Sequence, residues 1–240
     1  MPGSVSCVVP RRAGGCVVTL QHGFYSLNLK DSKLSLIAEV ERDLGDNRFN
    51  DGKCDTSGRF WAGTMNTKED SATGALYCLL GDRSVKKMLS RVTVSNGLGW
   101  TPDDKTMFFT DTGTKVISAF DYNASTGKIK NRRKVKAFSD AKLLPDGMAV
   151  DSEGMIWIAF WGGSMVSRWN PSTGRKLDEI RLPVTQVTSC CFGGEKLDEM
   201  FITSARVGLK GEALKKQPQA GALFRVKVNV KGLPTNSFAG

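Results

Sequence analysis

A repeated segment, a polar turn followed by an aromatic or β-branched strand, constrains the fold more than any other feature of the chain. Four copies lie at residues 55–64, 101–110, 151–159 and 194–203, and a weaker fifth lies at 11–19. A period of about 40–50 residues is typical of propellers and other repeat folds. The sequence therefore predicts that similar supersecondary units follow one another along the chain.

A second repeated unit follows several of these copies and supplies the rest of each repeat. Residues 118–129 and 167–177 each read as a strand, a turn containing Asn, Ser, Thr and Gly, and a further strand. Such turn residues are typical of hairpins, with Gly supplying positive φ. Four short strands per repeat, without a convincing helical period, predict propeller blades. We expect an all-β fold of about five blades, with residues 1–240 forming a single domain.

Composition narrows the class of partner. Lys and Arg outnumber Asp and Glu by 34 to 24, a formal charge of +10. The basic residues are scattered among turns and acidic neighbours, and no basic helix or aromatic RNA-binding signature accompanies them. We therefore expect a solvated basic surface and no nucleic-acid partner, with binding to a polyanion as the alternative.

The cysteines and the apolar stretches indicate the compartment. None of the six cysteines forms a C-x-x-C pair, so a metal–thiolate site is not expected. The start of the chain lacks the pattern of a signal peptide, and residues 13–29 alternate like strands instead of forming a membrane span. We expect a cytoplasmic protein with reduced thiols that does not associate with membranes.

Equivalent positions at the entry to the first strand of each repeat carry oxygen-bearing side chains. They are separated by 44, 46, 50 and 43 residues and are Ser6, Asn50, Asn96, Asp146 and Ser189. In a propeller such positions converge on one central axis. A ring of carboxylate, amide and hydroxyl oxygens suits a hard cation such as Ca²⁺, Mg²⁺ or Mn²⁺.

The same residues have a simpler interpretation as turn formers. Asn-Asp-Gly at 50–52, Asn-Gly at 96–97 and Pro-Asp-Gly at 145–147 are common turn sequences. Their shared register on the repeat favours a site, but the two interpretations stay open here. Other catalytic schemes are weaker, because His22 is the only histidine and no G-x-S-x-G motif is present.

Several motifs in fixed order resemble one known family. They are residues 47–53 (NRFNDGK), 58–65 (GRFWAGTM), 95–98 (SNGL), 145–148 (PDGM), 188–194 (TSCCFGG), 217–222 (QPQAGA) and 237–240 (SFAG). Together they look like the SMP-30/gluconolactonase family. The resemblance implies a six-bladed β-propeller with one divalent cation on its axis, and an enzyme that hydrolyses sugar lactones.

The resemblance also implies roles for individual residues. Asn96 and Asp146 match two metal ligands of the family, and Asp146 also matches its proton-transfer residue. Arg48 and Asn50 match residues that contact the substrate. The implied cofactor is one divalent cation, Ca²⁺, Zn²⁺, Mn²⁺ or Mg²⁺, and the implied partner is a small sugar lactone.

Two departures from the family pattern affect this expectation. Family members begin about one blade earlier, with a Glu that is the third protein ligand of the metal, and no Glu of this chain replaces it. We therefore expect a chain that lacks the N-terminal blade, binds metal weakly and has little lactonase activity. In addition, Lys68 stands where the family has a substrate-contacting Glu, with Glu69 next to it. A non-enzymatic calcium-binding or regulatory propeller protein is the alternative function.

Overall fold

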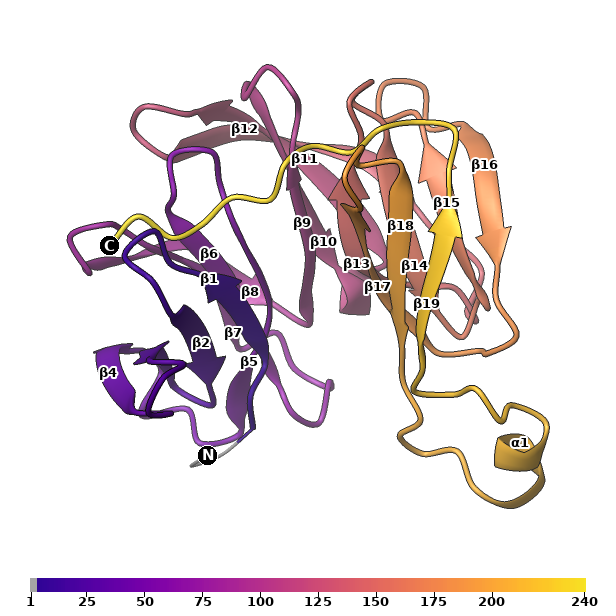
Figure 1. Cartoon of the computed structure of the whole chain (residues 1–240), viewed down its shortest axis with the longest axis horizontal. Helices are drawn as coiled ribbons and strands as arrows, with labels where there is room; N and C mark the ends of the chain where they lie inside the picture. Colours follow the sequence, from indigo (N-terminus) through magenta and orange to yellow (C-terminus); the bar gives the residue numbers. More distant parts are fainter. Residues whose placement is uncertain (1–3) are drawn as a thin grey trace. The chain divides into compact units, whose positions relative to one another are not determined.

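The computed structural model describes residues 4–240 and consists almost entirely of short antiparallel strands. These strands form five separate sheets, and within each sheet the strands are neighbours in the order in which they follow along the chain (Figure 1). Sequential antiparallel sheets of about four strands are the blades of a β-propeller. The predicted all-β fold with five blades is confirmed.

The first two sheets occupy the first third of the chain. The first contains β1 (Cys7–Pro10), β2 (Cys16–Leu20), β3 (Gly23–Leu27) and β4 (Leu34–Glu39). The second contains β5 (Asn47–Cys54), β6 (Phe60–Asn66), β7 (Gly74–Leu79) and β8 (Val85–Val92).

The remaining three sheets follow in the same manner. The third contains β9 (Ser95–Trp100), β10 (Thr106–Asp111), β11 (Val116–Asn123) and β12 (Lys128–Ala137), with the 3₁₀ turn η1 (Thr112–Thr114) between two of them. The fourth contains β13 (Leu144–Val150), β14 (Ile156–Trp161), β15 (Met165–Trp169) and β16 (Lys176–Arg181). The fifth contains β17 (Val187–Gly193), β18 (Glu199–Ser204) and β19 (Leu223–Lys227).

Burial explains why neighbouring strands of one blade differ so much in composition. Every residue of β6 and β7 is buried, and both strands consist mainly of apolar residues. The last strand of each four-stranded sheet is largely exposed, and β12 and β16 accordingly carry mostly charged and polar side chains. A strand covered on both faces needs apolar residues throughout, whereas an outer strand tolerates charge.

The chain forms two compact units, each with its own core. The first comprises the chain as far as Asn96 together with Asp121–Lys130 and Thr235–Gly240, and the second comprises Gly97–Phe120 and Asn131–Pro234. In the first unit, Phe49 and Phe24 are fully buried, with ring centroids 4.8 Å apart. In the second, Trp157 and Phe192 pack edge to face at 6.2 Å. The prediction that residues 1–240 form a single domain stays a prediction.

The repeated segments fall at the same place in every sheet. The polar turn of each copy leads into the second strand, which is β2, β6, β10, β14 or β18. In two copies the turn begins with a fully buried aspartate that accepts a hydrogen bond from a tryptophan six residues later. Trp61 donates to Asp55 over 2.8 Å, and Trp157 donates to Asp151 over 3.0 Å. In these two copies the repeat therefore encodes a buried hydrogen bond between the turn and the strand that follows it.

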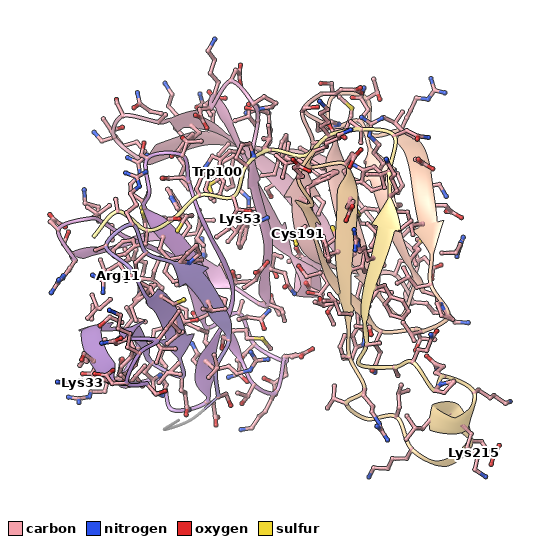
Figure 2. The ribbon with its side chains drawn as sticks, in the orientation of Figure 1. Arg11, Lys33, Lys53, Trp100, Cys191 and Lys215 are labelled. Atoms are coloured by element: carbon pink, nitrogen blue, oxygen red, sulfur yellow. The ribbon has the colours of Figure 1, made fainter. Side chains whose placement is uncertain are left out.

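Two segments depart from the regular pattern. The connection between β18 and β19 contains the only α-helix of residues 4–240, the five-residue α1 (Gly211–Lys215), and Lys215 projects from it in Figure 2. No helix in this part of the chain is long and apolar enough to cross a membrane. The C-terminal residues of the first unit pair with its first sheet: Phe238 is fully buried and donates from its backbone N to the Pro10 carbonyl over 2.8 Å.

Candidate metal and substrate site

The turn-like sequences at the predicted ring lie inside strands. Asn50 belongs to β5, Asn96 to β9 and Asp146 to β13, each in the first strand of its sheet. The register of β5 shifts between Phe49 and Gly52, and that of β13 shifts between Pro145 and Met148. The interpretation of these motifs as simple turns is therefore wrong. Those at 50–52 and 145–147 lie at register shifts typical of β-bulges, which re-aim side chains and occur often beside active sites.

The glycines after the ring positions permit close approach of neighbouring strands. None of Gly52, Gly97 and Gly147 has a positive φ, so left-handed geometry does not explain them. A Cβ on Gly97 would lie 2.7 Å from the Asp146 carbonyl oxygen, and one on Gly147 would lie 2.2 Å from Ser189 Oγ. Only glycine fits at such distances, and the close approach brings β9, β13 and β17 together at the level of Asp146.

Arg48 and Asn50, both predicted to contact substrate, are directly bonded. Arg48 donates from NH1 to Asn50 Oδ1 and to the Phe49 carbonyl, each over 2.9 Å. Asn50 in turn donates from Nδ2 to the Ser95 carbonyl over 2.8 Å. These bonds fix the orientation of the Asn50 amide. They leave Nε and NH2 of Arg48 without a hydrogen-bond partner among residues 4–240.

The guanidinium of Arg48 is partly buried and therefore partly desolvated. Burial lowers the pKa of its guanidinium, and the negative charge of Glu69 acts in the opposite direction. Glu69 is exposed and lies in the β6–β7 connection with a φ of 58°. The adjacent Lys68 forms an ion pair with Asp46, with its Nζ 2.9 Å from the carboxylate. Glu69 is thus the acidic neighbour of Arg48, although the two form no ion pair.

Asp146 and Asn96 lie on separate units. Asn96 is buried, with 6% of its surface exposed, and is the last residue of the first unit's main segment. Asp146 lies in the second unit, in the bulge of β13. The preceding residue, Pro145, accepts a hydrogen bond over 2.6 Å from Thr112 Oγ1 in η1. The joint role of Asn96 and Asp146 as metal ligands stays a prediction.

The sequence did not single out two residues beside these positions. Thr112 donates from its hydroxyl to the Pro145 carbonyl and so supports the bulge that carries Asp146. The only sequence feature that could have indicated this role is a hydroxyl-bearing residue directly after a buried strand. Asp51 follows Asn50 in the bulge of β5 and accepts a hydrogen bond from the Gly52 backbone N over 2.7 Å. Burial raises the pKa of the Asp51 carboxyl, while Lys53 and the Gly52 bond partly offset this effect.

The donor types at Asn96 and Asp146 match the preferences of hard cations. Within residues 4–240, no three His, Cys, Asp or Glu side chains cluster as metal ligands. Asn96 and Asp146 instead offer an amide oxygen and one carboxylate, which are donors that Ca²⁺ and Mg²⁺ prefer. Gly97, the residue after Asn96, packs directly against the Asp146 carbonyl. Each of the two residues, taken by itself, therefore carries a donor type that suits such an ion.

Curated proteins with similar sequences include regucalcins of several vertebrates. This chain is 43% identical to regucalcin of Homo sapiens over 246 residues, which span 100% of this chain and 82% of the relative. It is 45% identical to regucalcin of Gallus gallus over 242 residues, 98% of this chain and 81% of that protein.

Solved structures agree with this relationship. A calcium-binding protein, regucalcin, of Agrobacterium tumefaciens superposes with a TM-score of 0.94 at 28% identity, covering 99% of this chain and 80% of its own. A luciferin-regenerating enzyme superposes with a TM-score of 0.92 at 32% identity, covering 100% and 83%. The model of the SMP-30/Gluconolactonase/LRE-like region matches residues 1–206. With its bladed fold and bulged first strands, this chain belongs to the SMP-30/gluconolactonase family.

Proposed function

We propose that the chain is a metal-dependent hydrolase of sugar lactones. The observation that carries this proposal is the hydrogen-bonded chain from Arg48 through Asn50 to Ser95, which presents a guanidinium with two unused donors. Asp146 occupies the same position of the repeat as Asn50, two blades further along the chain. The oriented guanidinium of Arg48 and the carboxylate of Asp146, each on the first strand of its blade, suit the binding and hydrolysis of a polar cyclic ester. The family of this chain supports the same reaction class.

Asn96 and Asp146 are the residues that would hold the divalent cation. Such an ion supplies Lewis-acid polarisation of the lactone carbonyl and lowers the pKa of a bound water. Because the described residues offer it one carboxylate, its affinity is expected to be low, since Ca²⁺ affinity rises with the number of charged ligands.

The protein's own groups account for the proton and charge movements. Hydrolysis forms a bond between a water oxygen and the lactone carbonyl carbon, and breaks the bond from that carbon to the ring oxygen. Asp146 accepts the proton that the water loses, and then delivers it to the departing ring oxygen. Arg48 donates from Nε or NH2 to the carbonyl oxygen as negative charge develops there, or to sugar hydroxyls. Asn50 keeps Arg48 in position.

We also propose that this activity is cytoplasmic. All six cysteines are thiols in the structure, including the adjacent Cys190 and Cys191. Burial raises the pKa of Cys54 and of Cys78 to about 12, so these two thiols are inert structural groups. Reduced, unreactive thiols are typical of proteins of the cytosol.

The test is the hydrolysis of gluconolactone by the purified chain in the presence of Ca²⁺, Mn²⁺, Zn²⁺ or Mg²⁺. Asp146→Asn preserves the shape of the side chain and removes its charge, and we expect turnover to fall by roughly 100-fold or more. Asp140→Asn is the matched control, because Asp140 is an exposed carboxylate in the β12–β13 connection, just before the strand that carries Asp146. Full activity in Asp146→Asn would contradict the proposed role.

The second candidate is a non-enzymatic calcium-binding protein. One structural relative is described as a calcium-binding protein. Calcium binding by a folded chain, measured calorimetrically, together with no turnover of any lactone, would favour this function over the first.

A further inference from the structure

Arg48 carries a positive charge that no carboxylate neutralises by direct contact. Its two hydrogen bonds from NH1 go to neutral acceptors, the Phe49 carbonyl and Asn50 Oδ1. Among residues 4–240 it forms no ion pair, and the carboxylate that acts on it, Glu69, is exposed. Two other arginines of this protein differ in this respect: Arg59 and Arg168 each place Nε within hydrogen-bonding distance of a buried aspartate.

An unpaired guanidinium in a partly buried place is unfavourable until an anion reaches it. Moving a charge out of water is opposed by desolvation, and a carboxylate partner offsets this loss best when both groups form hydrogen bonds. The free edge of Arg48, formed by Nε and NH2, is the fork that binds a planar carboxylate through two parallel bonds. A sugar hydroxyl would satisfy one donor and leave the charge unbalanced.

The charge of the whole chain acts in the same direction. Its formal net charge is +10, which raises the local concentration of anions and speeds their association. The neutral gluconolactone gains nothing from this field. A lactone that keeps a second, ionised carboxyl group would benefit both from the field and from the fork of Arg48.

We propose that the preferred substrates are lactones of sugar diacids, whose remaining carboxylate is bound by Nε and NH2 of Arg48. This inference rests on the proposed lactonase function for its reaction, but the recognition step is independent of turnover. Arg48 would be the residue that determines specificity, with Asn50 holding the fork in orientation. Neutral sugar lactones would be hydrolysed more slowly.

Binding tests the recognition step without any reaction. We would compare glucarate, an unreactive diacid, with glucitol, its neutral analogue, by calorimetry at low ionic strength and constant Ca²⁺. The wild-type chain is expected to bind glucarate roughly tenfold more tightly, as one charge-assisted bidentate contact allows. Arg48→Met should abolish this preference, and Arg48→Lys should keep part of it as a point charge without the fork.

Arg42→Met is the matched control for the loss of one positive charge. Arg42 is exposed and pairs with Glu39 at the surface, so the variant should keep the full preference for glucarate. Equal binding of glucarate and glucitol to the wild-type chain would overturn the proposal. So would a preference for glucarate that survives in Arg48→Met.

Turnover then connects recognition to the reaction. For the wild-type chain, kcat/KM for glucarolactone should exceed that for gluconolactone by roughly tenfold, and added salt should reduce the ratio. In Arg48→Met the ratio should approach one. A ratio near one in the wild type would contradict the proposal, whereas no turnover of either lactone, with the binding preference intact, would contradict only the lactonase function.

Discussion

Asn50 donates from Nδ2 to the Ser95 carbonyl over 2.8 Å and so joins the first strand of the second sheet to the first strand of the third. Ser6 makes the equivalent bond one blade earlier, from its Oγ to the Phe49 carbonyl over 2.5 Å. In both cases a side chain at the ring position reaches the residue before the next ring position. The side chains of Ser6 and Asn50 thus link the first strands of successive blades as well as offering oxygen donors. Asn50 also orients Arg48 through its Oδ1.

The double role of Asn50 gives the first prediction. Asn50→Ala removes both hydrogen bonds of the amide, to the Ser95 carbonyl and from Arg48, so the free energy of unfolding should fall by about 1–3 kcal/mol. Asn28→Ala is the control, because Asn28 is exposed and its Oδ1 only accepts, from the Lys30 backbone N. Urea unfolding measures both changes. Equal stability of the two variants would show that the Asn50 bond contributes nothing.

The second prediction concerns the support of Asp146 by Thr112. Thr112→Val keeps the shape of the side chain but removes the hydroxyl that bonds the Pro145 carbonyl, so the bulge of β13 loses a fixed anchor. Metal affinity should fall by roughly tenfold, as is typical for groups that orient metal ligands. Thr112→Ser should restore it.

Thr114→Val provides the matched comparison in the same 3₁₀ turn. Its hydroxyl donates to the Asp111 carbonyl over 3.0 Å, and not to β13, so metal affinity should be unchanged. Calorimetric titration with Ca²⁺ decides the question. A Thr112→Val variant that loses thermal stability yet binds metal normally would reduce Thr112 to a purely structural residue.

Asp51 predicts an unusual dependence of stability on pH. Because burial raises the pKa of its carboxyl in the folded state, the folded chain binds the proton more tightly than the unfolded chain. Between the unfolded and the folded pKa, stability therefore falls as pH rises. Asp51→Asn should stabilise the chain at neutral pH, and the gain should disappear as pH falls below the unfolded pKa of about 4.

The opposite sign is expected at Asp82. Hydrogen bonds from the Ser84 hydroxyl and backbone lower the pKa of the Asp82 carboxyl, so its charged form stabilises the folded state above the unfolded pKa. Asp82→Asn should therefore lower stability slightly at neutral pH. Urea unfolding across the acidic range would reveal both trends. Parallel curves for the wild type and Asp51→Asn would disprove a raised pKa at Asp51.

The buried network around Asp55 gives a prediction about folding alone. Asp55 is fully buried and accepts bonds from Arg59 Nε at 2.6 Å, Trp61 Nε1 at 2.8 Å and Tyr122 OH at 2.7 Å. Arg59→Met would leave an uncompensated carboxylate, and should destabilise the chain by about 3–5 kcal/mol. Trp61→Phe removes one neutral donor and should have a smaller effect. If thermal unfolding ranks the two variants in the reverse order, the network is not organised around charge.

The repeat made much of the fold predictable. The turn from Asp55 to Trp61 and that from Asp151 to Trp157 share their spacing because both encode the same buried bond. The hairpin turns were predictable for a similar reason: Asn170 Oδ1 accepts from the Ser172 backbone N, which is local chemistry written in consecutive residues. Local interactions of this kind leave a pattern in the sequence.

The site was less predictable because its geometry depends on residues far apart in the chain. Asn-Asp-Gly at 50–52 reads as a turn, and only packing against neighbouring strands makes it a bulge within β5. The bond from Thr112 to Pro145 joins residues 33 positions apart and follows no motif. The short helix α1 likewise has no buried residue and therefore no apolar period to reveal it.

Removal and return of metal test the central claim most directly. The initial rate of gluconolactone hydrolysis would be measured after exhaustive chelation of the wild-type chain, and again as Ca²⁺, Mn²⁺ or Zn²⁺ is added back. A metal-dependent lactonase loses its activity on chelation and regains it along a saturable curve, which Asp146→Asn flattens. A rate that chelation leaves unchanged, or that Asp146→Asn regains along the same curve, would contradict the account.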